Sequence, residues 1–361
     1  MAAIAALAAL VFVMNPSGPQ PPAEQRLSSG GKPSKIREAN EYYERAMVAT
    51  RGGQFDLQRM RRMLERALEL DPKFAEARAE YATTHMLTVL TGVSNDTSWI
   101  YKAEEEARRA LQDDSECGRA RASLAAVYVQ QGRKEPALAE AEKAIKLNPN
   151  EPNAQLLFLS FHWYNGDLTE ARAVGQQIRE RFPLFFPARM FLGEILMEQG
   201  DTAAAIGEQE KILEQDPEHR PAALFLTRAY LYSGRLAEAR WILERARSAA
   251  PQNYSHRPYW AMLLALEGKR TEALREMDEE ALKYCGAMLP MTLLPADFYA
   301  VAGDKPKALD WLERAVRAGD DREEWFLRNP MLAKIRDEPR FKQILESVAH
   351  RRAQRAKAKQ Q

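Results

Sequence analysis

The sequence predicts an all-α fold, an α-solenoid of helix–turn–helix repeats, because three residue types recur at one constant interval. Glycine, alanine and proline each return every 34 residues through the middle of the chain. The recurring positions are Gly132, Gly166, Gly200, Gly234 and Gly268; Ala137, Ala171, Ala205, Ala239 and Ala273; and Pro149, Pro183, Pro217 and Pro251. A 34-residue period with this order is typical of repeats that contain two helices each. Such repeats stack along one axis, so we expect function on an extended surface rather than in a compact pocket.

Each residue type in the period has a physical reason. When the final proline of a repeat is numbered 32, positions 4, 7, 8 and 11 share one face of the first helix. Alanine at positions 8, 20 and 27 allows the two helices to approach closely. Glycine at position 15 suits the left-handed conformation that ends the first helix. Proline ends the second helix because it disfavours the helical conformation of the residue before it.

Composition divides the chain into five segments, of which the repeats are the longest. The segments are an apolar N-terminal segment at 1–14, a linker rich in Pro, Gly and Ser at 15–35, about eight repeats at 36–319, a C-terminal cap at 320–348 and a basic, disordered tail at 349–361. Within the cap, Phe341, Ile344, Leu345 and Val348 form an i, i+3, i+4, i+7 stripe. This stripe predicts a helix that covers the last repeat.

Two of the repeats depart from the regular pattern. Repeat two contains nine extra residues between His85 and Ala103, and Trp99 and Tyr101 follow them. The insertion is either a functional loop that presents these aromatic residues or a lengthened helix pair that buries them, and we favour burial. In repeat eight, the first helix is expected to start late, near Pro295, because proline is tolerated in a first helical turn.

The apolar segment Ala2–Met14 carries no charged residue. At about 1.5 Å per residue it would reach roughly 20 Å, short of a bilayer core of about 30 Å. It lacks a preceding basic region and a nearby cleavage signal. It is therefore the end of a membrane span that begins upstream, a signal peptide or uncleaved anchor, or a disordered apolar tail. We expect the protein to be membrane-associated or exported, on the periplasmic side, with a cytoplasmic location as the alternative.

The sequence shows no pattern of catalytic or metal-binding residues. The 52 basic and 51 acidic residues leave a net charge of +1, which favours neither nucleic acid nor anionic lipid. Cys117 and Cys285 lie in different repeats without metal-ligand spacing, and the five histidines are not paired. Phosphate-binding loops, nucleophile elbows and zinc motifs are not found. We therefore expect no enzyme activity, no cofactor, no metal and no nucleic-acid partner.

The repeats resemble those of the tetratricopeptide-repeat (TPR) family over about residues 38–318. The clearest matches are Leu192-Gly193, Leu196, Ala205 and Pro217 in one repeat, and Leu226, Tyr230, Ala239, Ala246 and Pro251 in the next. The resemblance implies a right-handed superhelix whose concave groove is lined by the first helix of each repeat. It also implies that a chaperone-type carboxylate clamp is absent, because the clamp positions hold Ala79, Thr83, Ala122 and Ala126 instead of Lys and Asn.

The resemblance further implies which side chains face the groove. The candidate peptide-binding residues are Leu156, Ser160, Trp163, Tyr164, Met190, Glu194, Met197, Leu224, Arg228, Leu231 and Tyr232, with Glu198 beside them. Aromatic and methionine side chains around one arginine and nearby acids suit an extended peptide or an amphipathic helix. In the alternative, these side chains pack between neighbouring repeats.

Two functions are consistent with this sequence. The first is a non-catalytic scaffold that binds a protein or peptide partner in the groove and is tethered to a membrane by its N-terminal segment. The second is the extracytoplasmic sensory or regulatory part of a membrane regulator, of kinase or winged-helix type, whose effector domain is not in this chain. The second follows from Asn329–Leu332 and Asp337–Phe341, which resemble the ends of repeat regions in bacterial membrane-anchored regulators.

Overall fold

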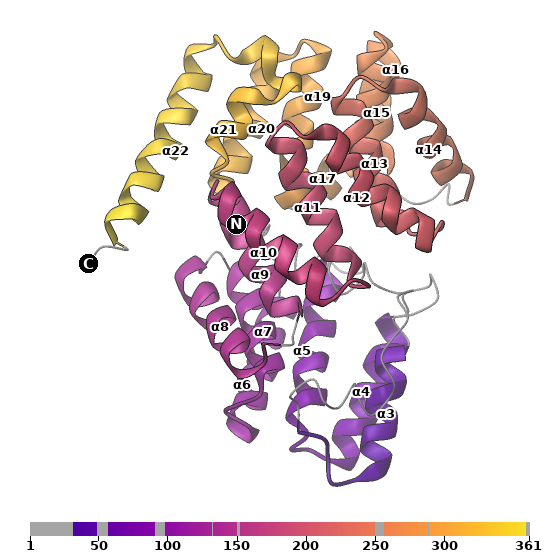
Figure 1. Cartoon of the computed structure of the whole chain (residues 1–361), viewed down its shortest axis with the longest axis vertical. Helices are drawn as coiled ribbons and strands as arrows, with labels where there is room; N and C mark the ends of the chain where they lie inside the picture. Colours follow the sequence, from indigo (N-terminus) through magenta and orange to yellow (C-terminus); the bar gives the residue numbers. More distant parts are fainter. Residues whose placement is uncertain are drawn as a thin grey trace. The chain divides into compact units, whose positions relative to one another are not determined.

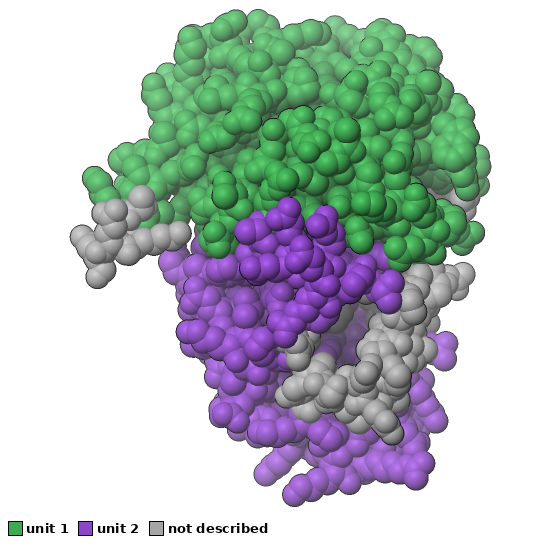
Figure 2. All heavy atoms as spheres, in the orientation of Figure 1, with its two compact units in different colours: residues 1, 162–172, 189–361 green, residues 2–161, 173–188 purple. Residues whose placement is uncertain are grey.

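The computed structural model describes residues 32–48, 57–90, 98–131, 133–149, 152–249, 256–287 and 289–358. These residues form 20 α-helices and one 3-10 helix and contain no strand, which confirms the all-α prediction (Figure 1). The chain divides into two compact units (Figure 2): unit 1 comprises the described residues of 162–172 and 189–361, and unit 2 those of 2–161 and 173–188. The predicted N-terminal segment and nearly all of the linker lie outside the described residues.

Unit 2 is built from successive helix pairs. Its helices are α3 (Arg37–Val48), α4 (Leu57–Leu70), α5 (Ala75–Leu90), α6 (Ser98–Asp113), α7 (Gly118–Gln130), α8 (Lys134–Leu147), most of α9 (Pro152–Tyr164) and the larger part of α10 (Leu168–Arg181). The helices α3 and α4, α5 and α6, and α7 and α8 pack on one another, and α4 and α6 also contact the helices that follow them. Each of these helix pairs therefore packs against the next, as a stacked repeat requires.

Unit 1 continues with the remaining repeats and ends in a cap. It contains the end of α9, the start of α10 and, from residue 189 on, most of α11 (Phe186–Glu198). Its other helices are α12 (Thr202–Gln215), α13 (Arg220–Tyr232), α14 (Leu236–Ala249), α15 (Arg257–Leu266), α16 (Arg270–Glu276), α17 (Glu279–Ala287), α18 (Leu289–Thr292), α19 (Leu294–Ala302), α20 (Lys305–Ala318), α21 (Glu323–Arg328), the 3-10 helix η2 (Pro330–Ile335) and α22 (Pro339–Ala358). Helix α22 packs on α20, and η2 packs on α19 and α20.

The repeated glycines and alanines have the roles that the period predicts. Gly166, Gly200, Gly234 and Gly268 have φ between 74° and 91°, the left-handed conformation that ends a helix. Gly132 and Pro251 lie outside the described residues. The alanines at position 20 of the described repeats are buried, from Ala137 to Ala273. Small side chains at these points let the paired helices pack closely.

The C-terminal cap forms as predicted, but the chain after it does not. Phe341, Ile344 and Val348 are buried, which confirms the apolar stripe of a closing helix. Helix α22 continues to Ala358, so most of the stretch predicted to be a disordered tail is helical. The physical reason is that Arg351 and Arg355 form ion pairs with the buried carboxylate of Asp321, which fixes the last turns of the helix.

The two irregular repeats are accommodated in different ways. Helices α5 and α6 are both 16 residues long, so lengthened helices absorb part of the insertion in repeat two, while 91–97 lie outside the described residues. Trp99 is half-buried and Tyr101 is 66% exposed, so the expected burial is wrong for Tyr101. Helix α19 starts with Pro295 in its first turn, which confirms the late start of repeat eight. No helix in the described part of the chain is long and apolar enough to span a membrane.

Close packing around the buried alanines predicts a position-dependent cost of enlargement. In α12, Ala205 is buried whereas Ala203 is exposed. We expect Ala205→Leu to lower the free energy of unfolding in urea by about 1–3 kcal/mol, because the extra atoms overpack the helix pair. Ala203→Leu, in the same helix, should change it by less than about 0.5 kcal/mol. Equal losses for the two variants would contradict the assignment of Ala205 to the interhelical contact.

Candidate functional site

The structure places nine of the eleven predicted groove residues in unit 1 and two, Leu156 and Ser160, in unit 2. All are buried except Leu224 and Tyr232, which are half-buried. Six residues of unit 1 form what we call the acceptor face: Trp163, Tyr164, Glu194, Glu198, Arg228 and Tyr232. Glu194 and Glu198 lie one turn apart on α11, as Arg228 and Tyr232 do on α13, so each pair projects from one side of its helix.

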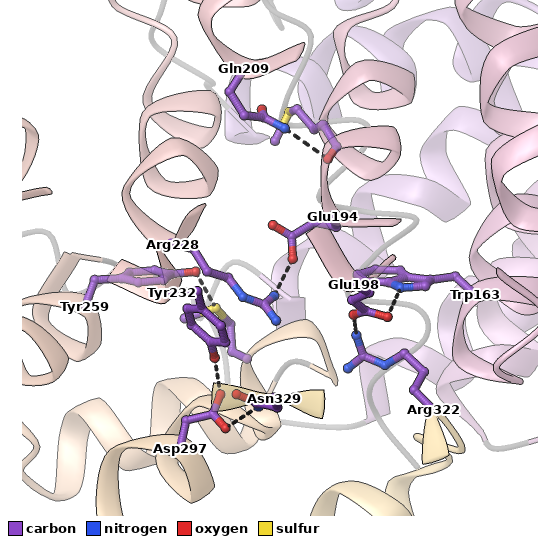
Figure 3. Close-up of polar contacts among 12 residues, drawn as sticks. Trp163, Glu194, Glu198, Gln209, Arg228, Tyr232, Tyr259, Asp297, Arg322 and Asn329 are labelled. Carbon is purple, nitrogen blue, oxygen red and sulfur yellow. Dashed lines mark hydrogen bonds and ion pairs between the residues drawn. The ribbon is translucent and has the colours of Figure 1, made fainter. Parts of the chain in front are cut away.

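The first ion pair of the acceptor face joins α11 to α13. The Arg228 Nη1 atom lies 2.5 Å from the Glu194 Oε2 atom, and both side chains are buried (Figure 3). The Arg228 guanidinium also lies 5.1 Å from the centroid of the Tyr232 ring. Burial raises the pKa of Glu194 even though Arg228 favours its charged form. This pair therefore carries a desolvation cost that only its close geometry offsets.

A segment from the end of the chain covers the acceptor face. We call residues 320–329 the C-terminal segment; it contains α21 and the residues that flank it. The backbone N–H of Asp321 donates a hydrogen bond of 2.9 Å to the carbonyl oxygen of Tyr164. The Arg322 guanidinium donates to Glu198 and lies over the rings of Trp163 and Tyr164, at 4.7 Å and 5.0 Å from their centroids. The other Glu198 oxygen accepts a 3.0 Å hydrogen bond from Trp163 Nε1 (Figure 3).

The Arg322 side chain is held in position by its own neighbour. Its Nε and Nη2 atoms donate to the two oxygens of Asp320 at 2.8 Å and 2.6 Å, the two-point geometry of a strong arginine–carboxylate pair. Arg322 and its two carboxylate partners, Asp320 and Glu198, are almost completely inaccessible to solvent. The guanidinium therefore brings two carboxylates together in the interior of unit 1, one of them 124 residues away along the chain.

A second group of contacts secures the other end of the C-terminal segment. The Trp325 ring stacks on the Tyr232 ring at 5.7 Å with an interplanar angle of 19°. The Tyr232 hydroxyl donates to the buried carboxyl of Asp297, and Asn329 Nδ2 donates to the same group at 2.7 Å (Figure 3). Burial raises the pKa of Asp297 to about 7, against the lowering effect of these two donors and of Arg228. Burial likewise raises the pKa of Glu198 to about 7.

Sequence reasoning missed the residues that occupy the acceptor face. The sequence places Asp320 and Arg322 only in the cap, and Asn329 in the cap and in the segment that resembles membrane regulators. It indicates no role for Asp297. The available signal was three consecutive charged residues, Asp320 to Arg322, directly after the last repeat. A solvated chain end has the same composition, so this signal does not indicate burial by itself.

Unit 2 contains a separate aromatic and basic cluster next to the insertion of repeat two. The Arg61 guanidinium and the Lys102 ammonium lie 4.8 Å and 4.2 Å from the centroid of the Trp99 ring, and the His85 ring lies 5.2 Å from it. Burial, together with the charges of Arg61 and Lys102, lowers the pKa of His85 to about 4. His85 is therefore neutral near pH 7 and packs as an uncharged aromatic ring. Among the described residues, no cluster of side chains could hold a metal ion.

This arrangement of stacked helix pairs, with a face that holds a peptide segment, defines an α-helical repeat protein of the interaction type. Profiles of the tetratricopeptide repeat match residues 196–267, and residues 102–152 together with 162–220. The chain therefore contains tetratricopeptide repeats in these residues, as its 34-residue period predicts. Among curated proteins, none matches the sequence.

Solved structures with a similar fold share little sequence with this chain. The human IFIT1 dimer with PPP-AAAA has 17% identity and a TM-score of 0.57, and the match covers 81% of this chain and 75% of that one. The Pseudomonas aeruginosa pilF structure has 19% identity and a TM-score of 0.42, covering 58% and 89%. TTC0263, a thermophilic TPR protein in Thermus thermophilus, has 19% identity and a TM-score of 0.45, covering 54% and 99%. At such identities the IFIT1 likeness indicates a common fold only.

The raised pKa of Asp297 predicts how stability depends on pH. In the unfolded chain an aspartate titrates near pH 4, whereas folded Asp297 titrates at about 7. Its contribution to stability is therefore full below about pH 4 and is lost as pH rises through about 7. The free energy of unfolding, measured in urea, should therefore be larger at pH 5 than at pH 8. We expect Asp297→Asn to reduce this difference by on the order of 2 kcal/mol. Glu198 acts in the same direction.

The control for this prediction is Asp310→Asn, which changes a carboxylate whose side chain is 61% exposed. It should leave the pH dependence of the unfolding free energy unchanged. If the unfolding free energy of Asp297→Asn depended on pH in the same way as that of the wild type and of Asp310→Asn, Asp297 would not have a raised pKa in the folded protein.

Proposed function

We propose that this protein is a non-catalytic interaction scaffold that binds an extended or helical segment of a partner protein on the acceptor face. TPR proteins in general bind protein or peptide partners and are typically not enzymes. The observation that carries the proposal is the C-terminal segment itself. A short segment of the same chain, distant in sequence, is already seated on α9, α11 and α13 through side-chain contacts and one backbone hydrogen bond. A surface that orders one short segment in this way has the features needed to receive another.

The chemistry of the acceptor face supports a selective site rather than a general apolar surface. Trp163 and Tyr232 offer aromatic faces to the residues seated on them, at 4.7 Å for Arg322 and 5.7 Å for Trp325. Aromatic and arginine side chains dominate the binding energy of protein interfaces when they are desolvated and well packed. Glu198 adds a buried carboxylate, whose charge only a correctly placed cation can compensate. These features suit recognition of specific side chains along a short segment.

The remaining predicted groove residues have less direct support. Met190, Met197 and Leu231 are buried in unit 1, Leu224 is half-buried, and Leu156 and Ser160 belong to unit 2. Their contact with a partner stays a prediction. We place the proposed binding site on the six residues of the acceptor face. Four of them contact the C-terminal segment directly: Trp163, Tyr164, Glu198 and Tyr232. Arg228 contacts Tyr232, and Glu194 is included because it pairs with Arg228.

A regulatory role in a membrane-bound protein is the second candidate. It is favoured by the apolar residues 2–14, outside the described part of the chain, and by Asn329–Leu332 and Asp337–Phe341, which lie at the start of η2 and at the start of α22. On this proposal the protein is attached to a membrane or exported. Fractionation of the native protein tests it: recovery in the membrane fraction after a high-salt wash is expected, and complete recovery in the soluble cytoplasmic fraction would contradict it.

The scaffold proposal is tested by selecting peptides on the full chain and locating where they bind. A phage-displayed library of random short peptides is selected on the wild-type protein and, in parallel, on Arg322→Ala, whose docked segment lacks its central contact. Enriched peptides are synthesised with a photo-crosslinker. We expect cross-links to α11, α13 or the end of α9, because these helices present the acceptor face. Trp241, 59% exposed on α14, provides the control for non-specific attachment to an exposed aromatic ring. Cross-links that are confined to α14 and vanish in Trp241→Ala, or no enriched peptide at all, would contradict the proposal.

A further inference from the structure

We infer that the acceptor face is a receptor for a partner segment in which an arginine lies two residues after an acidic residue, and that the chain's own Asp320–Arg322 occupies this receptor. Such a partner binds only when the C-terminal segment leaves. The inference rests on the proposed scaffold function and names the chemistry of its ligand. The geometry points to arginine, because the central contact of the docked segment is the buried Arg322 guanidinium.

The surroundings of Arg322 match a guanidinium better than an ammonium. The group lies over two aromatic rings, those of Trp163 and Tyr164, and donates to the Glu198 carboxylate from one edge. Its other edge is used by Asp320, which belongs to the segment itself. A planar guanidinium can stack and donate along two edges at once, whereas a lysine ammonium cannot. The acidic residue two positions earlier is therefore part of the recognised motif.

The turn after α9 is shaped for close approach of a peptide backbone. A Cβ atom added at Gly166 would lie 3.1 Å from the carbonyl oxygen of Asp321, while Cβ atoms at Gly200, Gly234 and Gly268 would meet no atom within 4 Å. All four glycines have a positive φ, so the turn conformation alone does not distinguish them. The difference is that the docked segment runs directly against Gly166. The Asp321 backbone N–H also donates a hydrogen bond to the Tyr164 carbonyl oxygen. The receptor therefore recognises the backbone of the docked segment as well as its side chains.

The docked segment leaves polar groups of this region unsatisfied. The Tyr164 hydroxyl, Arg228 Nε and Trp325 Nε1 are buried and have no hydrogen-bond partner within the described parts of the chain. A buried polar group without a partner lowers the stability of the state that contains it. A different segment that offers acceptors to Tyr164 and Arg228 would gain these bonds, and release of the C-terminal segment would return Trp325 to water. A partner segment that satisfies these groups can therefore bind the acceptor face more tightly than the C-terminal segment does.

The ends of the C-terminal segment allow it to separate from its neighbours. Gly319, which ends α20 with φ of 109°, precedes it, and Pro330, the first residue of η2, follows it. Release therefore requires backbone changes at these two element boundaries. It also breaks the terminal hydrogen bonds from the Asp320 N–H to the Ala315 carbonyl oxygen and from the Leu332 N–H to the Asn329 carbonyl oxygen. Asp321 is held on the other side by Arg351 and Arg355, whose side chains are partly exposed to solvent.

The test uses a synthetic peptide with the sequence of residues 318–330, titrated into the full chain. The wild type should bind it weakly, because its site is filled. Arg322→Ala, which empties the arginine position, should bind it at least about tenfold more tightly. A peptide with alanine in place of its arginine should not bind the variant. A folded Arg322→Ala protein that fails to bind the arginine peptide would overturn the inference, as would equal binding of the two peptides.

Hydrogen exchange on the wild-type protein keeps the inference testable if Arg322→Ala does not fold. Amides of 321–328 should exchange at least about tenfold faster than those of α20, through local opening of the segment. Gly166→Ala should accelerate that exchange further, whereas Gly200→Ala, which strains an equivalent turn away from the segment, should not. Exchange of the segment only together with α20, at the rate of global unfolding, would show that it is a permanent part of the core.

Three further outcomes separate this inference from others. Light scattering that shows dimers of Arg322→Ala on addition of wild-type chain would identify a second copy as the occupant and overturn the claim of a separate partner. Selected peptides that cross-link to α11 and α13 but lack arginine would leave the scaffold function intact and overturn only the arginine motif. Failure of the random-peptide selection together with tight binding of the 318–330 peptide to Arg322→Ala would confine the receptor to its own segment, which would also overturn the claim of a partner.

Discussion

The Arg322 guanidinium is the interaction on which the docking of the C-terminal segment in unit 1 depends. It is buried between the carboxylates of Asp320 and Glu198 and stacks on Trp163 and Tyr164, so it joins the end of the repeats to helices far earlier in the chain. Removing one member of such a buried pair leaves an uncompensated charge and costs about 3–5 kcal/mol. Replacing the whole group by apolar side chains would cost less. The group therefore contributes specificity of docking more than net stability.

The charged groups of the acceptor face are buried rather than solvated. Burial raises the pKa of Glu194 and Glu198 on this face, and also that of Asp297 on α19. Arg228 and Arg322 compensate the first two, while Tyr232 and Asn329 donate to the third. The compensating groups come from different parts of the chain, so the correct partner is recognised by several geometric conditions at once. A segment with the wrong charge at the Arg322 position would leave Glu198 unpaired.

Most of the fold could be predicted from sequence because its determinants are local. The 34-residue spacing of glycine, alanine and proline places turns and helix contacts without knowledge of distant residues, and Gly166 to Gly268 adopt the expected backbone conformation. The resemblance also places Trp163, Tyr164, Glu194 and Arg228 on the first helices of successive repeats, and their role in a binding groove stays a prediction. The covering segment could not be predicted, because the pair Glu198–Arg322 spans 124 residues and its charged residues have the composition of a solvated end. For the same reason the helical extension of α22, fixed by Asp321, was assigned to a disordered tail.

A double-mutant cycle between Glu198 and Arg322 tests the central claim most directly. The free energies of unfolding of the wild type, Glu198→Gln, Arg322→Gln and the double variant are measured in urea at pH 8, where Glu198 is largely ionised. The account predicts that each single change is costly and that the second change adds much less than the first, with a coupling free energy of about 2 kcal/mol or more. Additive effects, with a coupling below about 0.5 kcal/mol, would show that the two side chains do not meet and that the C-terminal segment does not dock on the acceptor face.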